Sequence, residues 1–289
     1  MPSSITHELI AEAAAEAFPE EIRRLAGDHP DYFFLGAQGP DLFFFYRFIQ
    51  RKEQNFGKFL HRHRPLECFE YFAKKVREGN DRMRAYIAGY ITHYATDVAF
   101  HPFVYAYLER LNAGKLEHQQ IESDWDVYFL RSRRGREVEC YDFPFSGKRI
   151  AREGILFRLF APLCLYLERD PLDEDKLASA LTAFELYLKF FHGECYETNE
   201  SWLRVEKFFR AKSTMSRLFP RKTPNADYLG GDDFETLSGG AKNADELFDR
   251  AVKDSIKLVG ILFSCAEKDT PLPKEEFSKH FLTGKQFEK

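Results

Sequence analysis

The chain has 289 residues and a formal net charge of -4, and it contains 30 Phe, 14 Tyr and 2 Trp. So many large apolar side chains can form a packed core, which excludes intrinsic disorder and allows one large domain or two small ones. The acidic balance argues against a general nucleic-acid-binding surface, and no segment approaches the roughly 18 apolar residues of a membrane span.

The first residues and the cysteines favour a cytoplasmic location. The segment MPSSITHELIAEAAAEAFPE has no basic start and no long apolar run, so we do not expect a secretory signal. The five cysteines lie far apart and form no CxxC pair, so we expect reduced thiols in the core. They are Cys68, Cys140, Cys164, Cys195 and Cys265.

Helical spacing of apolar residues dominates the chain, and no segment alternates as a strand does. In chain order we expect helices at residues 4–18, after Pro19, from Pro40 through Leu42, Phe45 and Phe48, and at 57–76, 81–101, 102–111, 117–132, 149–169, 172–192, 198–218, 243–267 and 273–282.

Prolines and glycines mark where the predicted helices begin and end. Pro102 should end the preceding helix near His101, and Asp170 with Pro171 should open the helix at 172. Residues 133–148 and 221–241 are expected to be loops. The prediction is an all-α fold in a single multi-helix domain, residues 1–289, with the candidate ligands in 1–130 and helices of 131–289 completing the core and pocket.

Two segments place imidazole and carboxylate groups on the same helix face. His93 and Asp97 are four residues apart in GYITHYATDVAFHPF, and His101 follows four residues later. His118 and Glu122 repeat the spacing. Such pairs can bind a divalent metal, and both ligand types suit zinc. The alternative for any single pair is an ion pair on a helix surface.

The surroundings of Asp97 favour the metal over the surface pair. The segment from Tyr86 to Phe103 is apolar and aromatic, and it contains no Lys or Arg. A buried carboxylate needs a compensating cation or hydrogen bonds, which a metal ion would supply. Three further residues would be unremarkable on their own. Asp41 fits an ordinary helix start, His61 lies near the start of a helix, and His7 lies beside the apolar face of the first helix.

Together these residues resemble the zinc-dependent phospholipase C family, which shares its all-helical fold with fungal single-strand-specific nucleases. The resemblance lies in THEL, GAQGPD, GKFLH, AGYITHYATDVAFHP and EHQQIESDWD over about residues 5–130, with a weaker part at 244–259. It implies two or three zinc ions. One would be held by Asp41, His61, His93 and Asp97, a second by His101, His118 and Glu122, and a third by His7 with Asp97.

The same resemblance implies a phosphodiester hydrolase in which Asp41 orients or deprotonates the attacking water. It makes His61 the ligand and leaves the nearby His63 outside the site. Secreted relatives begin with a Trp whose amine binds the third metal. This chain has no Trp near its start, so we hypothesise that Pro2 supplies that amine once Met1 is removed.

The residues leave open the native substrate and the functional class of the protein. A small phosphodiester or a phospholipid head group is expected, with peripheral membrane contact possible and no oligomeric state indicated. The alternatives are a nuclease or nucleotidase on the same fold and a metal-binding protein without turnover.

Three features near the site each have two interpretations. Leu42 to Tyr46 would line a pocket or belong to the core, and Asp124 and Asp126 would be exposed or support the ligands. The basic run from Arg131 to Arg136 would attract phosphate or simply end a helix.

Overall fold

The computed structural model describes residues 4–46 and 55–286, and within them every regular element is a helix. The α-helices are α1 (Ser4–Ala15), α2 (Glu20–Asp28), α3 (Pro30–Ala37), α4 (Phe56–Arg62), α5 (Pro65–Arg77), α6 (Asp81–Leu111), α7 (Lys115–Arg134), α8 (Gly147–Glu153), α9 (Ile155–Tyr166), α10 (Glu174–His192), α11 (Cys195–Phe208), α12 (Asp227–Gly230), α13 (Phe234–Leu237), α14 (Ala244–Lys268) and α15 (Lys274–Phe277). Short 3-10 helices are η1 (Gly39–Phe44), η3 (Val138–Cys140) and η4 (Ser216–Leu218). The predicted all-α fold is confirmed.

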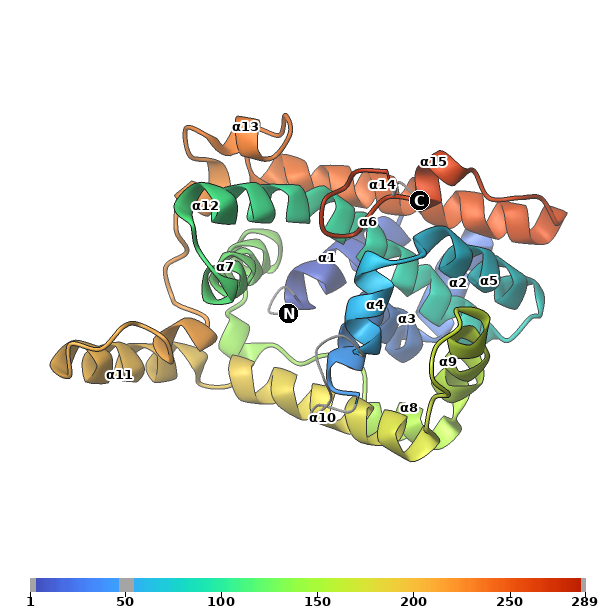
Figure 1. Cartoon of the computed structure of the whole chain (residues 1–289), viewed down its shortest axis with the longest axis horizontal. Helices are drawn as coiled ribbons and strands as arrows, with labels where there is room; N and C mark the ends of the chain where they lie inside the picture. Colours follow the sequence, from blue (N-terminus) through green and yellow to red (C-terminus); the bar gives the residue numbers. More distant parts are fainter. Residues whose placement is uncertain (1–3, 47–54, 287–289) are drawn as a thin grey trace.

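Helix α6 lies at the centre, with α3 and α14 packed along it (Figure 1). Asn80 caps its start, where the side chain accepts a hydrogen bond from the Met83 amide at 3.0 Å. The expected end at His101 is wrong, because α6 continues through Pro102 to Leu111. Proline removes one helix hydrogen bond, but Phe103 and Val104 beyond it are fully buried, so packing outweighs that loss.

Glycines let α3 approach α6 closely. A Cβ on Gly36 would lie 2.1 Å from the Tyr86 carbonyl oxygen, and one on Gly89 would lie 2.0 Å from that of Phe33. At Gly39, which has a φ of 54°, a Cβ would overlap the His93 ring at 2.3 Å. These close approaches bring the turn that carries Asp41 against the centre of α6.

Several predicted helices are shorter or divided. The segment 57–76 divides into α4 and α5 at Arg64, which has a left-handed φ of 52°, and 149–169 divides into α8 and α9 at Gly154. The segment 198–218 is helical only as α11, which begins at Cys195 and ends at Phe208. The segment 273–282 contains only α15.

Local chemistry explains other differences. Asp173, not Asp170, caps α10 by accepting from the Lys176 amide at 3.0 Å. The helix expected after Pro40 is the 3-10 helix η1, and Phe48 lies outside the described residues. Helix α3 was not predicted, and the short helices α12 and α13 fall in an expected loop. The last long helix is confirmed as α14.

Among the described residues, none of the helices has the length and apolar character needed to cross a bilayer. Many aromatic residues lie in the core around α6, where Tyr86, Phe160 and Phe72 meet edge to face. A second buried group surrounds Trp125 on α7, between α6, α1 and α14. The two groups together hold α1, α6 and α7 in place, and these helices carry most of the candidate ligands.

Candidate metal centre

Asp97 lies at the middle of a buried set of histidines. Its carboxylate oxygens are 3.4 Å from His7 Nε2 on α1, 3.6 Å from His61 Nε2 on α4, 3.3 Å from His93 Nε2 and 3.6 Å from His101 Nδ1 on α6. All of these side chains are buried. Segments separated by up to 94 positions in sequence therefore meet at one carboxylate.

The ligand atoms fall into three groups, and within each group they lie no more than 4.8 Å apart. The groups are His7, His93 and Asp97; Asp41, His61 and His93; and His101, His118 and Glu122. In the third group, Glu122 Oε1 is 3.1 Å from His118 Nε2 and 3.4 Å from His101 Nε2. All eight residues expected from the sequence are brought together, in spacings that a divalent ion could occupy.

Backbone carbonyls orient three of the histidines. Because a carbonyl oxygen only accepts, Nδ1 of His61, His93 and His101 must donate to Gly57 O at 2.7 Å, Ala37 O at 3.2 Å and Phe281 O at 3.1 Å, respectively. In the neutral ring the proton is then on Nδ1, and Nε2 carries the free lone pair. This is the tautomer and orientation that a metal-binding histidine requires.

Unsatisfied buried atoms show that these residues suit a metal ion. His7 Nδ1, His93 Nε2 and Asp97 Oδ2 are buried without a hydrogen-bond partner among the described residues. Among residues 4–46 and 55–286, no Lys or Arg forms an ion pair with Asp97. Leaving such atoms unpaired costs about 1–3 kcal/mol each. Imidazole and carboxylate ligands are those that zinc prefers, so the donor set fits.

The pKa directions agree with this interpretation. Burial lowers the pKa of His93, which favours the neutral ring. Burial alone would raise the pKa of Asp97, but the neighbouring His101 and His93 hold it well below its usual range. Burial alone would lower the pKa of His101, but Asp97 and Glu122 raise it to about 9. Protons and metal ions thus compete for the same nitrogen.

Asp41 differs from the other carboxylates because it is the more exposed, at 13% against 5% for Asp97. Burial would raise its pKa, but a hydrogen bond from His61 lowers it, so Asp41 is ionised at neutral pH. His61 Nε2 lies 3.2 Å from its Oδ1. Nearby, the Phe44 ring stacks on His61 at 5.4 Å, whereas Leu42, Phe43 and Tyr46 belong to the core, as the second of the two expectations had it.

The two acids that follow Glu122 are buried, and only Asp126 contacts a helix that carries a candidate ligand. Asp126 accepts from the Thr6 amide and the Thr6 hydroxyl, both at 2.7 Å, and so fixes α1 next to His7. Asp124 is fully buried and pairs with Arg221 on the far side of α7. Neither acid is exposed. Pro2, the hypothetical amine ligand, lies outside the described residues.

His63 and the basic run from Arg131 to Arg136 lie outside the candidate metal centre. His63 is exposed and belongs to none of the three groups, as expected. The basic run ends α7, where Arg131, Arg133 and Arg134 pair with Glu137, Asp245 and Glu12. The run is therefore a solvated helix end with its own partners.

The sequence did not reveal the contribution of the C-terminal segment 278–286. Its Phe281 ring contacts His61 at 5.4 Å and His93 at 6.3 Å, and its carbonyl accepts a hydrogen bond from His101 Nδ1. Tyr94 binds the backbone of Lys279 as both donor and acceptor. Gly284 touches α6 at Val98 and Pro102. The one available signal was this glycine, which has a φ of 64°.

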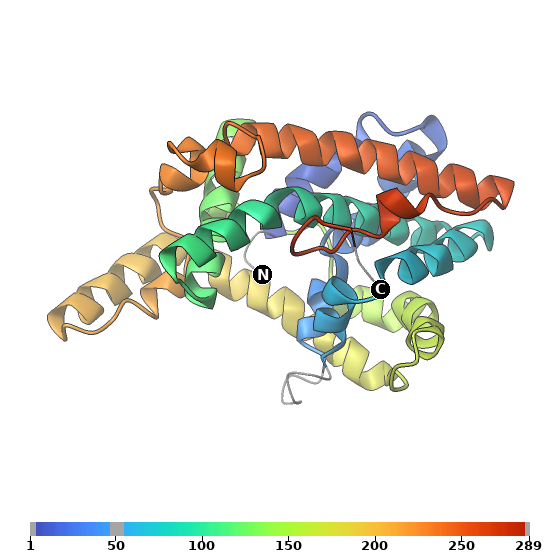
Figure 2. The same cartoon turned by 45° about the horizontal axis from the view of Figure 1, so that its top comes forward.

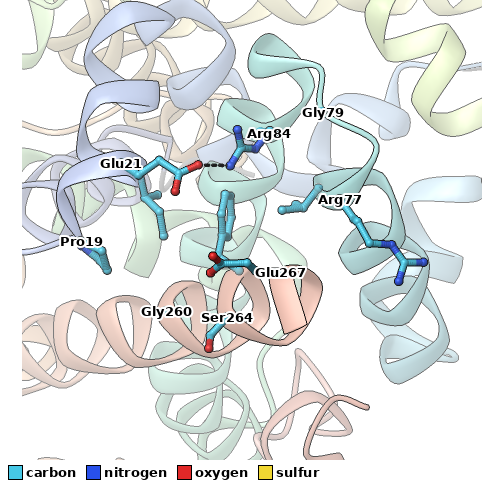
Figure 3. A pocket seen from close by; sticks show the side chains of 11 residues that line it. Pro19, Glu21, Arg77, Gly79, Arg84, Gly260, Ser264 and Glu267 are labelled. Carbon is cyan, nitrogen blue, oxygen red and sulfur yellow. Dashed lines mark hydrogen bonds and ion pairs between the residues drawn. The ribbon is translucent and has the colours of Figure 1, made fainter. Parts of the chain in front are cut away.

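A separate hollow of about 430 Å³ lies beside the first turn of α6 (Figure 3). It is lined by α2, α5, α6 and α14, and Arg84 pairs with Glu21 at its edge. Arg84 precedes Asp97 by 13 positions, which corresponds to roughly 20 Å along a helix. None of the candidate ligands lines this hollow, so it is distinct from the metal centre.

An all-helical fold around a buried, carboxylate-centred set of histidines defines a protein with a candidate multi-metal centre. The family model described as zinc dependent phospholipase C matches residues 6–155. This is more than half of the chain, and it contains all eight candidate ligands, so the protein belongs to the zinc-dependent phospholipase C family. No curated protein and no solved structure matches the chain. Family and site together support a metal-dependent hydrolase.

Proposed function

We propose that the protein is a zinc-dependent phosphodiester hydrolase. Asp41, His61, His93 and Asp97 would hold one ion, His101, His118 and Glu122 a second, and His7 with Asp97 a third. The observation that carries this proposal is the position of Asp97, whose carboxylate is within 3.6 Å of four histidine nitrogens from three helices. Membership of the zinc-dependent phospholipase C family supports it.

Zinc, when bound, supplies Lewis acidity that activates water and neutralises charge developing on phosphoryl oxygens. The chain supplies the positioning. Asp41 stays ionised and is partly accessible, so its free lone pairs can orient a water and accept its proton. The rings of Phe44 and Tyr105 stand beside His61 and His101, at 5.4 and 5.7 Å, and exclude bulk water from the ligands.

We further propose that the substrate is a small phosphodiester or a phospholipid head group, with the chain folded as one domain of residues 1–289. The long helix α14 packs against both α1 and α6, which supports a role for residues 131–289 in completing the core around the ligands. All five cysteines are free thiols, which supports a cytoplasmic location.

Turnover of defined substrates by the metal-loaded protein tests the proposal. We expect hydrolysis of bis(p-nitrophenyl) phosphate and of p-nitrophenyl phosphorylcholine, its loss in His118→Ala, and its retention in His63→Ala, a matched control from outside the three groups. Bound zinc without turnover of either diester would instead indicate a metal-binding protein. Faster cleavage of single-stranded DNA would indicate a nuclease.

A further inference from the structure

Helix α11 and the turn after it project from the body and carry unusually exposed apolar side chains. In Figures 1 and 2 the helix extends away from the other elements in both views. We define the α11 tip as residues 202–217. At its apex Phe208 is 80% and Phe209 71% exposed. Further exposed apolar residues of the tip are Trp202, Leu203, Val205 and Met215. Such a gathering marks an interaction surface.

Buried polar groups hold the α11 tip in shape. The Glu206 carboxylate accepts hydrogen bonds from the amides of Thr214 and Met215, at 2.8 and 2.7 Å, and from the Ser216 hydroxyl at 2.6 Å. The Asn199 side chain donates to the Ser216 carbonyl at 2.7 Å. The returning chain is thus fastened to α11, and the aromatic apex is a built feature, not a frayed helix end.

The charge of the tip is opposite to that of the whole chain. Residues 202–217 contain five basic residues and one acid, whereas the chain has a net charge of -4. The one acid, Glu206, is buried in the turn. Two of the basic residues, Arg204 and Arg217, pair with Glu200 and Glu117.

The other three basic residues of the tip lie beside the apex. Lys207 and Arg210 flank Phe208 and Phe209 directly in sequence, and Lys212 follows. None of these three forms an ion pair with any residue in the ranges 4–46 and 55–286. The apex therefore presents two exposed rings bordered by uncompensated positive charge.

We propose that the α11 tip docks the protein on an anionic lipid bilayer surface. A convex apolar apex bordered by Lys and Arg matches the bilayer interface, where rings enter the acyl boundary and long basic side chains reach phosphate. Trp202, at 36% exposure, adds a residue type that favours this interface. Charge complementarity selects an anionic surface, because the basic groups would gain from anionic head groups.

Helix α10 connects the tip with the metal centre. Phe190 on α10 is 65% exposed and contacts Phe219, just beyond the tip, at 5.8 Å. Three residues earlier, Tyr187 contacts Phe45 at 5.1 Å, directly after the 3-10 helix that carries Asp41. Docking at the tip would thus attach the body that carries the candidate centre to a lipid surface through α10 and α11. Only this consequence rests on the proposed function.

Vesicle co-sedimentation with the full chain tests the docking. We expect binding to phosphatidylcholine vesicles that contain phosphatidylserine, weaker binding without phosphatidylserine, and a decrease with added salt. Phe208→Ala with Phe209→Ala should weaken binding roughly 10- to 100-fold, because two rings lose their burial. Lys207→Gln and Lys212→Gln should each weaken it about fivefold.

The matched control is Leu165→Ala with Tyr166→Ala, an apolar pair on α9 with 62% and 49% exposure. We expect this variant to bind as the parent does. Equal losses in the control, or no binding to the anionic vesicles, would overturn the proposal. Self-association that disappears in the Phe208 and Phe209 variant would assign the tip to a second copy and also overturn it.

Binding is measured without turnover, so the two proposals fail separately. Vesicle binding by a protein that hydrolyses no phosphodiester would keep the docking site and reject the proposed enzyme. Hydrolysis of soluble diesters without vesicle binding would do the reverse. Circular dichroism of each variant confirms that helix content is unchanged.

Discussion

The metal centre and the α11 tip depart from ordinary burial in opposite directions. At the centre, Asp97 and His93 are buried on the largely apolar helix α6. At the tip, Phe208 and Phe209 are exposed to solvent. Both arrangements are costly in an isolated chain, since polar groups lose water in one and rings meet it in the other. In each case a ligand would remove the cost: we propose a cation at the centre and an anionic lipid surface at the tip.

The two regions are also built differently. At the centre, residues from five segments of the chain converge, so the site exists only in the folded chain. The tip is one continuous segment fastened by Glu206 and Asn199. Changes at the centre should therefore affect metal binding and the stability of the whole chain, and changes at the tip should stay local.

Replacement of Asp97 should have the largest effect. Asp97→Ala removes the carboxylate that lies within 3.6 Å of four histidine nitrogens, so we expect loss of bound zinc. We also expect phosphodiester hydrolysis to fall roughly 100-fold or more, which exceeds the usual effect of a residue that only orients a ligand. Elemental analysis and initial rates measure both. The exposed Asp232→Ala is the control, and unchanged zinc in Asp97→Ala would refute the assignment.

Metal removal should destabilise the entire chain. Chelation leaves Asp97 Oδ2 and His93 Nε2 buried without hydrogen bonds, whereas zinc at 100 times its Kd adds about 2.7 kcal/mol. For a chain of this size, that corresponds to a rise in Tm of roughly 4–5 °C when zinc is restored. Differential scanning calorimetry measures it. Equal Tm values with and without zinc would break the proposed link between metal and fold.

Displacement of the C-terminal segment should weaken metal binding more modestly. In Gly284→Val the new Cβ would lie 3.0 Å from the Val98 carbonyl oxygen and 3.1 Å from Pro102 Cγ, so the segment must move and His101 loses the Phe281 carbonyl. We expect zinc affinity to fall about 10-fold, as for other partners of ligating histidines.

The control for that experiment is Gly239→Val, which has a similar φ of 69° but open space around it. It carries the same backbone penalty without the collision. Competition with a chromogenic zinc chelator gives both affinities. Equal losses in the two variants would mean that the Phe281 carbonyl does not support His101.

Loosening of the tip should have the smallest effect on the chain. Glu206→Gln removes the acceptor for the Ser216 hydroxyl and weakens the hydrogen bonds from Thr214 and Met215. Hydrogen exchange at these two amides should accelerate while Tm and zinc content stay within error. A large fall in Tm would show that the tip is part of the global fold, contrary to the contrast drawn between the regions.

The sequence predicted the metal centre better than its surroundings. His93, Asp97 and His101 could be found because helical spacing fixes which residues share a face. Phe281 could not, because its contribution is a backbone carbonyl, which has no side-chain signature. The helix through Pro102 was missed because burial of Phe103 and Val104 overrides a local preference. The tip was missed because helical spacing in 198–218 does not show which face lacks a neighbour.

Anomalous diffraction from crystals grown with zinc, measured on both sides of the zinc absorption edge, tests the central claim most directly. The account predicts peaks within the groups Asp41, His61, His93, Asp97 and His101, His118, Glu122, with a third beside His7 if that ion is bound. No peak among these eight residues, or zinc only at the exposed His63, would contradict it.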